Sequence, residues 1–373
     1  MSVPRTRAAA RRAAFLARTP FRMGVAVLAC SAAVATALGA ASSSAANADV
    51  RISAAPSFGS SAAASFGSSV QGHAASLHPE GVAWDPTRGT FLVGSLRHGT
   101  VSVVRRDGTV RTLVDDPALV STTGIRVDAP RRRLLVANAD PGVGVKTSPA
   151  TAKHLAGVGI YDLRTGRRVR YVDLAKVAGD GGEHFGNDMA VAPDGTFYVT
   201  DSFAPIVYRV PVRGRATVLV RDGRLAGGGG FGANGIVWQR NHLIVGNYTT
   251  GRLYRVPVGP KPSARSGAAG QGMREVRLAG GPLVGADGIA SRPDGSLIVV
   301  TNKVASAGAD AVFTVRPSRA WGSAAVVRAV SPWADPAPTA VAVTPGGRAY
   351  VLSGRLDVLF GGSTTDAFTL RRF

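Results

Sequence analysis

The sequence predicts an all-β protein with the fold of a six-bladed β-propeller. A short pattern occurs six times along the chain, and each copy holds two apolar strands separated by a turn. The copies begin 43 to 64 residues apart, and paired strands that recur at about this spacing are typical of propeller blades. The first residues of the copies form a set that we call the column: Glu80, Thr123, Asn187, Asn234, Asp287 and Thr339.

Residues 1–48 precede the repeats and have the pattern of a secretory signal peptide. They contain six arginines and no acidic residue, with an Ala-rich apolar stretch at 23–41 and a small-residue motif that ends at Ala48. We therefore expect cleavage after Ala48 and secretion to the outside of the cell. The alternatives are a membrane anchor or a lipid anchor at Cys30 on the outer face. The pair Arg11-Arg12 leaves both Sec and twin-arginine export open.

Residues 49–72 are rich in Ser, Ala and Gly. This composition predicts a flexible leader before a propeller that covers 73–373. A short strand within the leader is the alternative, because such a strand can complete a blade. Cys30 is the only cysteine, so a disulfide framework, a cysteine zinc site and a cysteine nucleophile are excluded from the mature chain.

The chain is strongly basic, with a net charge of +21 that falls to about +15 without the signal peptide. Such a surface attracts anionic polymers or membranes. However, the arginines are scattered and are not interleaved with aromatic residues, so the pattern of a nucleic-acid-binding surface is absent from the sequence. We expect no nucleic-acid partner, no membrane insertion of the mature chain, and a monomer.

The elements of the blades can be followed in order along the chain. In the first repeat, apolar runs predict four strands at 82–84, 91–93, 101–104 and 110–114. Asp107-Gly108 is the turn signal of the last hairpin. An insertion at 139–155 makes the second repeat the longest, and it predicts either a lid over the binding face or a plain connector. The ring closes through a last strand at Ala367–Arg372 or through a strand from 50–72.

The column is where we expect a metal ion. In a propeller the innermost strand of each blade borders the central channel, so equivalent positions converge near its axis. The carboxylates of Glu80 and Asp287 then meet the amides of Asn187 and Asn234, and converging carboxylates repel unless a cation lies between them. A set of oxygen donors without His or Cys favours Ca²⁺, with Mg²⁺, Mn²⁺ or Zn²⁺ as alternatives.

Competing interpretations of these residues stay open. Asn and Asp at strand starts commonly cap turns, which explains any one member of the column but not four oxygen donors among six. Asp188 follows Asn187 and is expected on the opposite side of the strand by alternation. His184 is the histidine best placed to reach the channel mouth as a proton carrier, followed by His154 in the insertion. A surface location is the alternative for both histidines.

Three motifs follow one another along the repeats: Glu80-Gly81-x-x-Trp84, Asn234-Gly235-Ile236-x-Trp238, and Asp287-Gly288-Ile289 before Pro293-Asp294-Gly295. In this order they resemble the senescence-marker-protein, gluconolactonase and luciferin-regenerating family. The chain is also similar to diisopropyl fluorophosphatases, paraoxonases and strictosidine-synthase-like propellers. The resemblance covers about 78–355 and implies six blades, a divalent ion in the channel, and hydrolysis of lactones or phosphotriesters.

By position, the resemblance implies that the ion is bound by Glu80, Asn187, Asn234 and Asp287, and that Asp287 acts as base or nucleophile. Gluconolactonases carry an arginine two residues before the third-blade Asn, where this chain has Phe185. A sugar lactone is therefore not implied as the substrate.

The sequence predicts an exported metal-dependent hydrolase of lactones, esters or phosphotriesters. The ion would polarise a carbonyl or phosphoryl oxygen, and Asp287 or a water on the ion would be the nucleophile. His184 is the second candidate catalytic residue. The main alternative is a non-catalytic propeller in which calcium stabilises the channel and one face binds a ligand or an envelope polymer. A lyase of the strictosidine-synthase type is a third possibility, although no acid–base residue marks it.

Overall fold

The computed structural model describes residues 66–259 and 272–373, and their regular structure is β-strand apart from four short helices. The prediction of an all-β fold is therefore confirmed. The predicted signal peptide at 1–48 and most of the predicted leader lie outside the described residues. None of the described helices is long and apolar enough to span a membrane.

The strands form four-stranded antiparallel units, and the first strand of each unit carries one column residue. The first unit comprises β2 (Pro79–Asp85), β3 (Thr90–Ser95), β4 (Thr100–Val104) and β5 (Val110–Asp115). The second comprises β6 (Ser121–Asp128), β7 (Arg133–Ala139), β9 (Gly157–Asp162) and β10 (Arg168–Asp173). The third comprises β11 (His184–Val191), β12 (Phe197–Asp201), β13 (Ile206–Val210) and β14 (Thr217–Arg221), with β8 (His154–Leu155) in parallel beside β11.

The second half of the chain repeats this arrangement. The fourth unit comprises β15 (Ala233–Gln239), β16 (His242–Asn247), β17 (Leu253–Pro257) and β18 (Arg274–Ala279). The fifth comprises β19 (Ala286–Ser291), β20 (Leu297–Thr301), β21 (Ala311–Pro317) and β22 (Ser323–Val330), and β22 pairs in parallel with β18. The last comprises β23 (Pro338–Val343), β24 (Ala349–Ser353), β25 (Ala367–Arg372) and β1 (Ser69–His73). The helices lie in connections: η1 (Ala129–Arg131), α1 (Leu174–Ala178), η2 (Gly223–Leu225) and α2 (Leu356–Phe360).

The hairpins between first and second strands follow from their turn sequences. Gly195 and Gly295 have φ angles of +84° and +82°, a backbone conformation that glycine adopts without steric cost. In each turn the preceding aspartate accepts a hydrogen bond from the backbone N–H two residues on, at 2.8 Å for Asp194 and 3.0 Å for Asp294. These local bonds fix the register of the strands that leave the turn.

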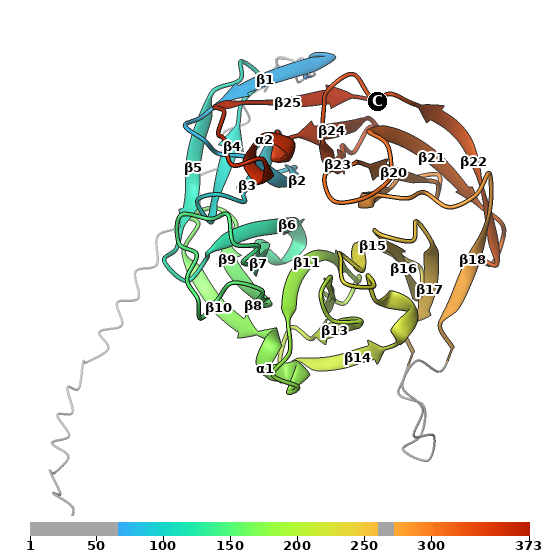
Figure 1. Ribbon diagram of the computed structural model, residues 1–373. Helices are drawn as coiled ribbons and strands as arrows, with labels where there is room; N and C mark the ends of the chain where they lie inside the picture. The colour runs from blue at the N-terminus through green and yellow to red at the C-terminus, as the bar shows by residue number, and fades with distance from the viewer. Residues whose placement is uncertain (1–65, 260–271) are drawn as a thin grey trace, which may run out of the picture. The chain divides into compact units, whose positions relative to one another are not determined.

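The first strands of the units are neighbours in a closed cycle. Within the described residues β2 contacts β6, β6 contacts β11, and the series runs through β15 and β19 to β23, which contacts β2 again. The hydrophobic core has the same organisation, because each of six clusters of buried side chains lies between two adjacent units. In Figure 1 the last strands, such as β5, β14 and β22, lie at the outer edge of the cycle.

The two described ends of the chain close this cycle in one sheet. β25 pairs with β24, and β1 pairs with the free edge of β25, where Val70 lies opposite Leu370. Both predicted ways of closing the ring are therefore used. Because β1 begins at Ser69, the folded part extends into the segment predicted as a flexible leader at 49–72. Phe66 anchors this start by edge-on packing against Phe91 at 4.7 Å between ring centroids.

The predicted insertion at 139–155 is a folded loop. The carboxylate of Asp140 accepts hydrogen bonds from the hydroxyls of Thr147 at 2.6 Å and Thr151 at 2.7 Å. The loop ends in β8, which pairs with the start of β11. Val143 packs against the leucines of α2, so the insertion borders the same end of the first strands as that helix.

Candidate functional site

A β-bulge lies at the start of every first strand, and it contains the column residue. Pairing with the second strand skips from Pro79 to Val82 in β2, and an equivalent shift occurs in β6, β11, β15, β19 and β23. Bulges of this kind turn a side chain out of the regular alternation. The residue after the column member is usually glycine for a steric reason: a Cβ on Gly235 would lie 2.2 Å from the carbonyl oxygen of Asp287 in the neighbouring strand.

The structure brings the four predicted metal ligands to one cavity of about 40 Å³. Their side chains line it together with Thr339: Glu80, Asn187, Asn234 and Asp287. All four are at most 9% exposed. The two threonines of the column bind backbone instead. Thr123 donates to the carbonyl oxygen of Gly186 at 2.8 Å, and Thr339 donates to that of Glu80 at 2.7 Å.

Two buried oxygen atoms of the column lack a hydrogen-bond partner among the described residues. They are Oε2 of Glu80 and Oδ1 of Asn187. Asn187 donates from Nδ2 to the hydroxyl of Ser202 at 2.9 Å, which orients its amide and leaves Oδ1 free. Buried acceptors normally find a donor, and leaving one unpaired costs about 1–3 kcal/mol. A cation between these oxygens removes that cost.

The carboxylates of the column are strongly perturbed. Burial raises the pKa of Glu80 well above its usual range, and the charges of Asp287 and Asp188 raise it further. Burial also raises the pKa of Asp287 to about 7, although hydrogen bonds from Asn302 and Asn234 act in the opposite direction. A divalent cation favours the ionised form of both carboxylates.

Asp188 does not line the cavity that the four predicted ligands share, and the expectation that it lies on the opposite side of β11 from Asn187 stays a prediction. It lies within the bulge between Gly186 and Met189. Asp188 lines a second small cavity together with Glu80 and Asp287. Its Oδ2 accepts a hydrogen bond from Nη2 of Arg126 at 2.8 Å.

Arg126 is a site residue that the sequence analysis missed. It stands three residues after Thr123, and the residues three places after the other column members are all Ala or Val. That contrast was the available signal. Because Arg126 neutralises Asp188, Glu80 and Asp287 would carry two negative charges once both are ionised, and one divalent cation balances these charges. The oxygen donors and their charge therefore fit a hard divalent cation.

The column is not a cation site made only of His, Cys, Asp and Glu side chains. In the part of the chain that the structure describes, no group of three or more His, Cys, Asp and Glu side chains could share an ion. The column differs because half of its four donors are amides. Amide oxygens are ordinary ligands of Ca²⁺, whereas Zn²⁺ prefers nitrogen and sulfur.

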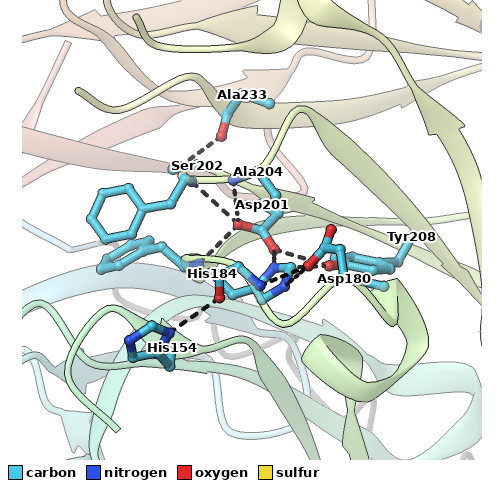
Figure 2. A network of polar contacts seen from close by, with 12 residues as sticks. His154, Asp180, His184, Asp201, Ser202, Ala204, Tyr208 and Ala233 are labelled. Carbon is cyan, nitrogen blue, oxygen red and sulfur yellow. Dashed lines mark hydrogen bonds and ion pairs between the residues drawn. The ribbon is translucent and has the colours of Figure 1, made fainter. Parts of the chain in front are cut away.

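His184 has a different environment from the one expected for a proton carrier in the channel. Its Nδ1 lies 2.7 Å from Oδ2 of Asp201, and its Nε2 lies 2.9 Å from Oδ1 of Asp180 (Figure 2). Asp201 also accepts hydrogen bonds from the Tyr208 hydroxyl and the Phe185 N–H, at 2.9 and 2.8 Å. With both ring nitrogens engaged, His184 ties β11 to β12, and this geometry offers no support for the catalytic role.

Comparison with known proteins places this geometry in a structural context. No family model and no curated protein matches the sequence. Among solved structures, Mala s 1, the major allergen of Malassezia sympodialis, is 20% identical with a TM-score of 0.62, over 82% of this chain and 96% of that chain. A gluconolactonase of Xanthomonas campestris is 18% identical with a TM-score of 0.50, over 83% and 92%. Regucalcin, a calcium-binding protein of Agrobacterium tumefaciens, is 17% identical with a TM-score of 0.51, over 82% and 93%.

The neighbours include gluconolactonase-like and regucalcin-type propeller proteins, and the four-stranded units of this chain form the closed cycle described above. The chain has a propeller fold. At 20% identity or less the likeness concerns the fold alone, and one fold supports many activities. The chemistry of this propeller must therefore be argued from its own side chains.

The histidine network predicts that the stability of the propeller depends on pH. Burial lowers the pKa of His184, but the hydrogen bonds and charges of Asp201 and Asp180 outweigh this and raise it above 6.5. Such a group stabilises the fold fully below its unfolded pKa of about 6.5, and the contribution is lost as the pH rises through the higher folded value.

We expect the melting temperature, measured with calcium present, to fall as the pH rises from about 6.5 to about 9. His184→Gln should flatten this slope, and His73→Gln, an exposed histidine, should leave it unchanged. Calorimetry across the pH range measures both. An equally steep slope in His184→Gln would contradict the assignment.

Proposed function

We propose that this protein is a six-bladed propeller that acts as a divalent-cation-dependent hydrolase of lactones or esters, with Ca²⁺ as the cation. The closed cycle of four-stranded units supports the number of blades. One observation carries the function: two buried carboxylates and two amides meet at the floor of a cavity, and two of their oxygens have no partner. Carboxylates with raised pKa values in a cavity are typical of reactive sites.

The names of two structural neighbours agree with this proposal. One is a gluconolactonase and another is a calcium-binding protein. Their similarity is confined to the fold, so they support the class of reaction and the kind of ion without naming the substrate of this chain. Phosphotriesters are the second substrate class, because a phosphoryl oxygen can occupy the place of a lactone carbonyl.

The side chains can be assigned to steps of lactone hydrolysis. Glu80, Asn187, Asn234 and Asp287 would hold the cation, which when bound supplies Lewis acidity toward the carbonyl oxygen. Asn302 donates to Oδ2 of Asp287 at 2.6 Å and thereby orients the carboxylate. Asp287 accepts a proton from water as the water oxygen bonds to the carbonyl carbon. The ring C–O bond then breaks, and the alkoxide takes the proton from Asp287 to give a hydroxy acid, so only water is consumed.

Turnover tests this function directly. δ-Valerolactone and a neutral aryl phosphotriester should be offered to the secreted protein with calcium and with a chelator. We expect hydrolysis that is lost on chelation and restored by added calcium. Calcium binding without any turnover would favour the non-catalytic propeller instead. Turnover that survives chelation would contradict the role of the cation.

We also propose that the protein acts outside the cell as a monomer, after removal of residues 1–48. The arginine-rich start and the Ala-rich stretch of the sequence support export. We expect protein recovered from the culture medium to begin at Asp49, which mass spectrometry of the intact chain measures. Retention in the membrane fraction with residues 1–48 attached would contradict cleavage, and a lipid-modified Cys30 would establish the anchored alternative.

A further inference from the structure

The wall of the cavity above the column is apolar. Six side chains from separate parts of the chain form it: Leu96, Phe185, Phe231, Val304, Leu356 and Phe360. We call this set the apolar rim. Leu96 and Leu356 are buried, at 2% and 5% exposure, whereas Phe360 is 40% exposed. The rim therefore runs from the floor of the cavity toward solvent.

The aromatic part of the rim is fixed by ring packing. The centroids of Phe185 and Phe231 are 5.3 Å apart in an edge-on arrangement, and Phe231 packs in the same way on Tyr248 at 5.8 Å. Such pairs hold one another in defined orientations. This side of the cavity is consequently a preformed apolar surface.

The helix α2 forms the other side of the apolar rim. The buried side chain of His78 fixes the position of this helix. The ring of His78, which is 1% exposed, lies 3.1 Å through Nδ1 from the carbonyl oxygen of Arg355, just before α2. Its Nε2 accepts a hydrogen bond from the N–H of Thr365, five residues after the end of the helix, at 3.1 Å. Both ends of the α2 segment are thus tied to one buried side chain, and Leu356 and Phe360 are held at the cavity.

The polar groups in the wall above the column are already satisfied within the protein. Tyr248 donates from its hydroxyl to Oδ1 of Asn302 at 2.6 Å and accepts from the N–H of Ala305 at 3.0 Å. Asn302 donates from Nδ2 to Asp287 and to the carbonyl oxygen of Pro338, at 2.6 and 2.9 Å. No side-chain donor of the described wall is left for a ligand hydroxyl, so a polyhydroxylated substrate would lose its bonds to water without replacement.

We propose that the substrate is an apolar lactone or ester, whose carbonyl group lies at the column and whose alkyl chain lies along the apolar rim toward Phe360. This inference rests on the proposed hydrolase function and specifies its substrate class. An alkyl chain gains from burial against Leu96, Phe231 and Leu356, by about fourfold in affinity for each methylene removed from water. Sugar lactones are disfavoured by the same wall, because it leaves no side-chain donor for their hydroxyls.

A series of lactones with one ring size tests the proposal on the calcium-loaded protein. δ-Valerolactone carries no side chain, δ-octalactone carries a propyl chain and δ-decalactone a pentyl chain, while glucono-δ-lactone presents hydroxyls. We expect kcat/KM to rise along the alkyl series, by up to about fourfold for each methylene that reaches the rim. Glucono-δ-lactone should be the poorest substrate of the four.

Two variants of the apolar rim, chosen to have little effect on the core, test whether the alkyl chain lies along it. Phe360→Ser and Val304→Ser should each lower the ratio of kcat/KM for δ-decalactone to that for δ-valerolactone by several-fold. Val327→Ser, at a 49% exposed valine of β22 outside the rim, is the matched control and should keep the ratio of the wild type. Melting temperatures verify that all three variants are folded.

The outcomes separate this proposal from the function on which it rests. Faster turnover of glucono-δ-lactone than of the alkyl lactones, or rates independent of chain length, would overturn the substrate class while leaving the hydrolase intact. An unchanged ratio in both rim variants would overturn the placement of the chain. Absence of turnover on every lactone and ester would overturn the hydrolase itself.

Discussion

Replacing Asp287 by Asn is expected to lower the rate of hydrolysis and, without a cation, to stabilise the fold. A residue that transfers a proton in the transition state contributes about 10²–10⁴-fold to the rate, so kcat should fall by this factor. The same substitution should increase the stability of the cation-free protein. Burial raises the pKa of Asp287 to about 7, so the native protein without a cation binds a proton that the unfolded chain releases above about pH 4.

The stability of the cation-free protein should therefore fall as the pH rises from about 4 through about 7, and Asp287→Asn should remove much of this fall. The difference is measured as melting temperature in chelator at about pH 8, where the variant is expected to melt several degrees higher. With calcium the order should reverse, because the variant has lost a ligand. Asp294→Asn, in an exposed turn, is the control. A variant that is less stable in chelator and still active would contradict this account of Asp287.

Of the substitutions proposed for this protein, Asp201→Asn is expected to cause the largest loss of stability. The carboxylate is completely buried and pairs with His184, whose side chain is 2% exposed. It also accepts hydrogen bonds from the N–H groups of Phe185, Phe203 and Ala204 and from the Tyr208 hydroxyl. Removing one partner of a buried ion pair costs about 3–5 kcal/mol, because the other charge is left uncompensated.

Asp180→Asn is the matched control for this prediction. Asp180 contacts the other nitrogen of the same histidine at 2.9 Å, but its side chain is 34% exposed and water can replace it. Denaturant titration should therefore give a clearly smaller loss of unfolding free energy for Asp180→Asn than for Asp201→Asn. Equal losses would show that the burial of Asp201 does not determine its contribution to the free energy of unfolding.

The fold class was predictable because its determinants are local and repeated. Alternating apolar runs and Asp-Gly turns mark the strands, so the predicted strands at 82–84 and 91–93 fall within β2 and β3. The column was also predictable, because equivalent positions of a repeat must occupy equivalent places. Placing Glu80 and Asp287 in one cavity required only this symmetry.

The parts that sequence reasoning missed depend on departures from the repeat. Asp188 lies within the bulge at Asn187 and lines a second small cavity with Glu80 and Asp287. Arg126 is the only charged residue at its position among the repeats, and its partner lies in the next unit. The apolar rim joins Leu96 to α2 and to the insertion near Val143, which are far apart in sequence. No local pattern encodes such contacts.

Calorimetric titration of the chelator-treated protein with Ca²⁺ tests whether the column binds a cation. We expect one site per chain, with affinity that increases as the pH rises, because Glu80 and Asp287 must lose their protons to bind the ion. Glu80→Gln should remove most of the binding, while Glu275→Gln, an exposed carboxylate on the outer strand β18, should bind as the wild type does. Absence of calcium binding by the wild type, or equal binding by Glu80→Gln, would contradict a cation site at the column.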